Sequence, residues 1–144
     1  MLVFNKLVPE LSVSDFERSL KFYCQVVGFK IEYERPEDSF AYVSFCGSQI
    51  MLEQQEDEVT AWSVGQLVKP YGRGVNFSIE CLDAHALARK IEQAGYSLRK
   101  PVEDCEYRHD ACVHVQRNFL VQDPDGYLLR FAQRLSTKPV RDEL

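Results

Sequence analysis

The chain has 144 residues, of which 45% are hydrophobic and 27% charged, and its formal net charge at pH 7 is −5. This composition is typical of a globular domain that is long enough to bury a core without disulfides. The acidic balance and the lack of a basic cluster exclude an electrostatic footprint for nucleic acid. No apolar run approaches the roughly 20 residues of a membrane span, and the N-terminus lacks the features of a signal peptide, so we expect a cytoplasmic protein.

The five cysteines are odd in number and contain no CxxC pair. A disulfide framework and a zinc ribbon both require paired cysteines at short or regular spacings. We therefore interpret the cysteines as reduced thiols.

The first part of the chain has the pattern of a strand, a helix and three further strands. Leu11 and Val13 alternate on one face of a strand, and Ser14 to Glu17 matches a capping box at a helix N-terminus. Apolar residues at helical spacing continue to Gly28, which is typical of a helix end. Three strands are expected at 29–33, 40–45 and 49–53, with a turn at 35–38.

The same order of elements begins again after an acidic loop and a segment around Trp62 that has the pattern of a loop or a short helix. A strand is expected at 74–80, a helix between Asp83 and Gly95, a strand at 96–99 and a polar stretch through His109. The sequence therefore predicts one α+β domain over residues 1–144, built from two paired βαβββ units at about 6–54 and 73–133.

A predicted hairpin over residues 119–131 places one charged residue in an apolar strand. Asp123 to Gly126 carries the residues of a type I turn followed by a glycine that is free to adopt positive φ. Arg130 follows on the second arm, on the same side as Leu128. Either this arm emerges into solvent, or Arg130 points into a concave site.

The duplication itself predicts where a ligand would bind. Each βαβββ unit offers a sheet that a helix covers on one face, and two such sheets related by quasi-symmetry enclose a cup-shaped open barrel. Ligands bind in such concavities. Glu53 and Arg130 stand on the corresponding last strands of the two units, so they either face one another across the cup or lie in separate surface pairs.

The paired units, the helix opening at Val13–Tyr23, the strand with Met51-Leu52-Glu53 and the hairpin at Asp123–Arg130 together resemble the vicinal oxygen chelate superfamily. The resemblance covers roughly residues 6–133 and is closest to the bleomycin resistance proteins, whose relatives include glyoxalase I, extradiol dioxygenases and fosfomycin resistance enzymes. It implies a homodimer in which the neighbouring chain completes each cup, in several relatives by exchange of the first strand.

The enzymes of this superfamily hold a divalent metal with His, Gln or Glu side chains on strands that face the cup. The resemblance puts the first ligand position at or next to Val8, and the position that opens the second unit at Gly74 or Val75. Arg130 replaces the glutamate of the last strand. Glu53 is therefore the one possible metal ligand that remains at these positions. Because an arginine stays protonated and cannot ligate a metal, we expect neither a metal site nor a cofactor.

The residues expected to contact a ligand combine the two charged residues with aromatic and polar side chains. Aromatic rings stack on planar ligand groups, although packing in the core is the alternative for each of them. Trp62 follows an acidic run in a loop-like stretch, and this position indicates a lid or a partner surface. His114 matches a position at which several relatives carry a ligand-contacting tryptophan. The full set is Glu53, Arg130, Trp62, Tyr42, Phe45, Asn76, His114, Arg117 and Tyr127.

The sequence thus favours a binding module over an enzyme: a metal-free, homodimeric protein that sequesters a small molecule and has neither nucleic acid nor membrane as a partner. The resemblance implies a cationic glycopeptide antibiotic of the bleomycin class as the ligand, and hence a role in antibiotic resistance. The alternative is a metal-dependent lyase or dioxygenase that uses Glu53 and a histidine. Elemental analysis of the purified protein separates these two hypotheses.

Overall fold

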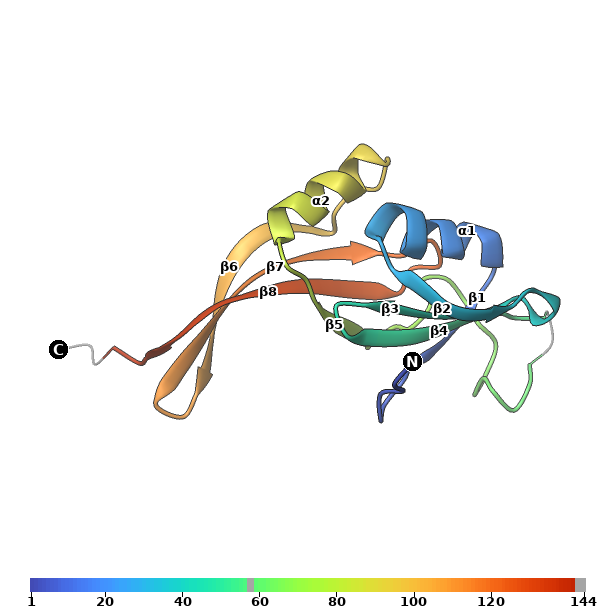
Figure 1. Ribbon diagram of the computed structural model, residues 1–144, viewed down its shortest axis with the longest axis horizontal. Helices are drawn as coiled ribbons and strands as arrows, with labels where there is room; N and C mark the ends of the chain where they lie inside the picture. The colour runs from blue at the N-terminus through green and yellow to red at the C-terminus, as the bar shows by residue number, and fades with distance from the viewer. Residues whose placement is uncertain (57–58, 142–144) are drawn as a thin grey trace.

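The computed structural model describes residues 1–56 and 59–141 and contains two four-stranded sheets (Figure 1). The first unit consists of β1 (Glu10–Val13), α1 (Phe16–Leu20) with a π-helical continuation (Lys21–Val27), β2 (Lys30–Arg35), a 3-10 turn (Pro36–Asp38), β3 (Phe40–Phe45) and β4 (Ser48–Gln54). The second unit consists of β5 (Asn76–Glu80), α2 (Ala84–Gln93), β6 (Lys100–His109), β7 (Cys112–Gln122) and β8 (Leu128–Pro139). The predicted α+β class is confirmed.

The two sheets have the same topology. Their strand orders are β1-β4-β3-β2 and β5-β8-β7-β6, and in each sheet the first and last strands of the unit pair in parallel. The register sets Ser12 beside Glu53 in the first sheet and Ser78 beside Arg130 in the second. Glu53 and Arg130 therefore occupy equivalent positions of the two units.

Both helices lie over the same side of the two sheets, which leaves the other side of each sheet without a helix (Figure 1). Alternate strand residues point to the helical side and bury an apolar core that runs through both units. Aromatic contacts join the units within this core: the ring centroids of Phe22 and Tyr96 are 4.9 Å apart, and those of Phe45 and Phe131 are 5.9 Å apart. We call the uncovered sides the first open face and the second open face.

Two local predictions are corrected at helix and strand boundaries. The N-cap of α1 is Asp15, whose carboxylate accepts from the backbone N–H of Arg18 at 3.2 Å, because the Ser14 side chain bonds to Asp125 instead. The strand expected at 96–99 does not form, and β6 lies in the polar stretch that follows it. Its sequence lacks an apolar alternation. Pairing with β7 at Lys100 and from Glu103 to His109 makes this stretch a strand.

The turn between β7 and β8 joins the two units through buried carboxylates. Asp123 is 5% exposed and Asp125 is 2% exposed. The Tyr23 hydroxyl donates to Asp123 at 2.7 Å, and the backbone N–H of Ser14 donates to Asp125 at 3.0 Å. Lys69 adds an ion pair to Asp125 at 3.4 Å. These bonds connect the turn to the end of β1 and to the helix that follows it.

Close packing explains the glycine in this turn. Gly126 has a φ of 98°, and a Cβ added there would lie 2.6 Å from the Cα of Pro70. A side chain is therefore excluded both by backbone strain and by contact with the preceding loop. The Tyr127 hydroxyl completes the junction by donating to the carbonyl oxygen of Ser12 at 2.9 Å.

The buried turn predicts a specific pH dependence of stability. Burial raises the pKa of Asp123 from 3.8 to about 6, so its protonated form is favoured in the folded protein. The protonated Asp123 carboxyl therefore stabilises the folded protein fully at pH values below its pKa in the unfolded chain. This stabilisation is lost as the pH rises through 6, its pKa in the folded protein. Between pH 4.5 and 7.5, we expect the free energy of unfolding of the wild type to fall by about 2 kcal/mol more than that of Asp123→Asn, which has no carboxyl to titrate.

Urea unfolding at the two pH values measures this difference. Glu17→Gln on the exposed side of α1 is the matched control, and its profile is expected to run parallel to that of the wild type. Parallel profiles for wild type and Asp123→Asn would contradict the assignment.

Candidate functional site

An aromatic pair lies on the first open face. The rings of Tyr33 and Tyr42 stack with centroids 5.1 Å apart and planes inclined by 16°. The Tyr42 hydroxyl donates to the side-chain oxygen of Gln49, and Phe4 meets the Tyr42 ring edge-on at 5.5 Å. Tyr42 is only 2% exposed beneath these neighbours, so of the two rings Tyr33, at 36% exposed, is the one that can stack on an aromatic ligand group.

An acidic pocket of about 380 Å³ opens between the first residue of β1, the last residues of β4 and the 3-10 turn. Five carboxylates and one indole line it: Glu10, Glu37, Asp38, Glu53, Glu56 and Trp62. Burial and, to a smaller extent, the charge of Glu53 raise the pKa of Glu10. Trp62 is 84% exposed and lies in a turn rather than a helix. A cationic group is therefore favoured at this end of the face.

The second open face carries Arg130 at its centre. Its Nε is buried and has no hydrogen-bond partner within residues 1–56 and 59–141. A buried, unpaired donor is costly, so Arg130 has unused capacity for an anionic or carbonyl oxygen. Ser78 on β5 is its register neighbour, and Asn118 on β7 donates to the Tyr107 hydroxyl at 3.0 Å on the same sheet.

The structure does not bring Glu53 and Arg130 together. No ion pair joins them among the described residues, since they lie on separate sheets whose uncovered sides point the same way (Figure 1). The predicted pairing across a cup is thus absent within one chain. Asn76, at the start of β5, alternates onto the same side as Ser78 and Arg130 and is exposed.

Three of the expected ligand-contacting residues make contacts within the fold. Phe45 stacks on Phe29 at 5.1 Å on the helical side, which is the core-packing alternative. Arg117 donates two hydrogen bonds to Asp104, at 2.8 and 3.1 Å, and these bonds lower the pKa of Asp104. Tyr127 belongs to the junction between the units.

His114 lies away from the centre of the second open face. Its ring is hydrogen-bonded to His109 on β6 and to Thr137 on β8. These contacts place it where the three long strands extend beyond the helices (Figure 1).

Two residues of the first open face are absent from the sequence-based prediction. Glu10 precedes Leu11 and Val13 in β1, and their alternation already indicates that it points to the uncovered side. Tyr33 has no such signal, because a bulge between Ile31 and Tyr33 changes the side to which it points.

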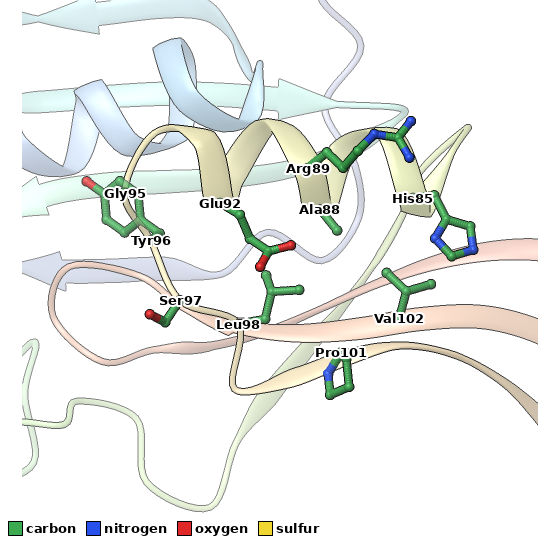
Figure 2. Close-up of a pocket in the computed structure, with 10 residues that line it drawn as sticks. All are labelled: His85, Ala88, Arg89, Glu92, Gly95, Tyr96, Ser97, Leu98, Pro101 and Val102. Carbon is green, nitrogen blue, oxygen red and sulfur yellow. The ribbon is translucent and has the colours of Figure 1, made fainter.

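A further groove of about 670 Å³ lies between α2 and the start of β6 (Figure 2). His85 and Glu92 flank an apolar floor that includes Ala88, Leu98 and Val102. The groove is on the helical side of the second sheet, so it is separate from both open faces.

The described residues contain no group of three or more His, Cys, Asp or Glu side chains arranged to hold a metal ion. At the two equivalent positions of the open faces stand one carboxylate, Glu53, and one cation, Arg130. A cation repels a divalent metal and offers no lone pair, so this donor set does not fit one. None of the helices in residues 1–56 and 59–141 is long and apolar enough to cross a membrane.

The family model of the glyoxalase/bleomycin resistance protein/dioxygenase superfamily matches residues 4–131. The chain belongs to this superfamily. A search of curated proteins finds no match.

Several solved structures resemble this superfamily member. TioX from Micromonospora sp. ML1 is 20% identical with a TM-score of 0.68, covering 92% of this chain and 100% of that chain. The virulence protein STM3117 from Salmonella typhimurium is 22% identical with a TM-score of 0.64, covering 94% and 100%. A superfamily member from Vibrio splendidus 12B01 is 33% identical over 88% of this chain and 95% of that chain, with a TM-score of 0.41. The first two likenesses show the shared fold.

The acidic pocket predicts asymmetric quenching of the single tryptophan. Because Trp62 is exposed beside Glu53 and Glu10, we expect caesium ions to quench its fluorescence about twofold more efficiently than iodide, each relative to free N-acetyltryptophanamide. Replacing both Glu10 and Glu53 by Gln is expected to reduce the asymmetry. Glu80→Gln, on the second sheet, is the matched control, and equal effects of the two changes would refute the geometry.

Proposed function

We propose that the chain is a metal-independent protein that binds and sequesters a small molecule in a site completed by a second copy. The observation that carries this proposal is Arg130, a cation at the position equivalent to Glu53, with a buried Nε that lacks a partner within the described residues. Its donors suit a carboxylate or a carbonyl oxygen, not a metal.

The opposite charges of the two open faces support a site that is completed by a second copy of the chain. One chain presents an acidic first open face and an unpaired guanidinium on the second, and the two do not face one another. A twofold axis would set the first open face of each copy against the second open face of the other, because an isologous interface forms every contact twice. Arg130 would then pair with Glu53 of the partner subunit, and a cup would close on each side.

The chemistry of the first open face supports a cationic ligand with a planar part. The acidic pocket and Trp62 favour a positive group, and the exposed ring of Tyr33, which packs on the buried Tyr42, favours an aromatic one. A glycopeptide antibiotic of the bleomycin class combines these features, and its sequestration in the cytoplasm would confer resistance. A metal-dependent lyase or dioxygenase remains the alternative, with Glu53 as its retained ligand.

Calorimetric titration tests the ligand site. We expect micromolar or tighter binding of a bleomycin-class glycopeptide to the wild type, and a loss of ~2–5 kcal/mol in Glu53→Gln or Arg130→Gln, because each change leaves a charge unpaired. The matched control is Lys138→Gln, at an exposed position of β8. Binding of a neutral aromatic compound instead would reject the resistance function, and unchanged binding in both variants would reject the site.

Light scattering tests the dimer. At ~100 μM an interface of standard size holds two chains together, so we expect the mass of a dimer. Glu53→Arg alone and Arg130→Glu alone are each expected to weaken the dimer. The double variant with both changes restores the ion pair with its charges exchanged, so it is expected to remain a dimer. A monomeric wild type at this concentration would contradict the proposal.

Elemental analysis tests metal independence. Zn, Ni, Fe and Mn are measured after purification without chelator, for the wild type and for Glu53→Gln. Near one equivalent that disappears in Glu53→Gln would support the lyase or dioxygenase. Metal that persists in Glu53→Gln lies outside the open-face site.

A further inference from the structure

The distal parts of three strands extend away from the helices and form an arm (Figure 1). We define the arm as residues 107–115 of the β6–β7 hairpin and 136–139 of β8, which pair across the sheet. Two of the three histidines of the chain lie on it, His109 on β6 and His114 on β7.

The two imidazole rings meet through one nitrogen each. Nδ1 of His109 lies 3.0 Å from Nε2 of His114. The outer nitrogens have partners of their own: Nδ1 of His114 lies 2.9 Å from the Thr137 hydroxyl, and Nε2 of His109 lies 3.9 Å from a carboxylate oxygen of Asp110. Thr137 thus orients the His114 ring from its far side, whereas Asp110 lies beyond hydrogen-bond distance of His109.

The 3.0 Å contact between the inner nitrogens requires a proton or a metal ion between them. A neutral imidazole carries one N–H, and where the Thr137 hydroxyl accepts the proton at Nδ1 of His114, Nε2 of His114 carries a lone pair. In the metal-free pair the N–H at Nδ1 of His109 donates to this lone pair. With the proton of His109 on Nε2 instead, both inner nitrogens carry lone pairs that a metal ion can bridge.

We propose that His109 and His114 chelate a borderline divalent transition metal, Zn²⁺, Ni²⁺ or Cu²⁺, through Nδ1 and Nε2 respectively. Imidazole suits these ions, and a ligating histidine commonly donates its other N–H to an oxygen, as Thr137 allows for His114. This assignment is independent of the proposed function, since it uses neither Glu53 nor Arg130.

The spacing fits such a chelate without movement of the strands. With metal–nitrogen bonds of about 2.0–2.1 Å, two adjacent ligands of a square-planar or tetrahedral ion lie about 2.9–3.4 Å apart. The 3.0 Å separation falls in this range. No third donor joins the pair among the described residues, so water completes the coordination.

A bound metal would tie β6 to β7 at the end of the arm, and Thr137 extends the connection to β8. Metal binding is therefore expected to slow hydrogen exchange in the arm and to leave exchange at the β7–β8 turn unchanged. His114 then acts as a metal ligand rather than as the ligand-contacting residue expected from its position in the sequence.

Calorimetric titration with ZnCl2, NiCl2 and CuCl2 tests the site on the full chain. We expect about one equivalent to bind to the wild type, and affinity to fall about 100-fold in His109→Ala and in His114→Ala. Thr137→Val removes only the outer partner, so a loss of about tenfold is expected. Glu53→Gln is expected to bind as the wild type does.

Two controls separate this site from adventitious binding. His85→Ala removes the third histidine, on α2, and Cys112→Ser removes the exposed thiol across the hairpin from His109. Both variants are expected to bind within about threefold of the wild type, because neither residue is a ligand. Wild-type affinity in His109→Ala and His114→Ala, or an equal loss in His85→Ala, overturns the proposal.

A measurement on the unmodified protein guards against misfolded variants. Nitrogen-resolved spectra of the histidine rings, recorded with Zn²⁺, are expected to show the metal on Nδ1 of His109 and on Nε2 of His114, with the proton of His114 on Nδ1. Rings whose nitrogen signals do not respond to Zn²⁺ overturn the proposal.

Discussion

The arrangement of the two units depends on two buried carboxylates in one turn. Asp123 and Asp125 belong to the second unit, yet Tyr23 and Ser14, from the first unit, supply hydrogen bonds to them. A buried carboxylate without such donors is destabilising, so these hydrogen bonds stabilise the fold with the β7–β8 turn against the end of β1. This contact, with the shared apolar core, sets both helices on one side and leaves both open faces on the other.

The two equivalent positions of the duplicated fold carry opposite charges. Glu53 and Arg130 have the same register relative to the first strand of their unit, beside Ser12 and Ser78. Within the described part of one chain the carboxylate shares its pocket with four other acids and forms no ion pair, and Nε of the guanidinium has no partner. A second copy would satisfy both, which is the physical reason to place the binding site between chains and not within one.

Features governed by short-range chemistry could be predicted from the sequence. Gly28 ends the first helix with a φ of 109°, because a glycine tolerates the left-handed conformation there. Asp83 caps α2 as expected, accepting from the backbone N–H of Ala86 at 3.0 Å. The order of elements and the α+β class followed from such local signals together with hydrophobic periodicity.

The sequence by itself determined the superfamily, the order of the elements and the residue types at the key positions. Only the tertiary structure decided what those residues touch: Ser14 bonds to a turn far along the chain, Phe45 points into the core, and His109 meets His114 across a hairpin. β6 is a strand because β7 pairs with it, whatever its own composition. The reason is that local conformation depends on neighbouring residues, whereas contacts depend on which strands pair and in which register.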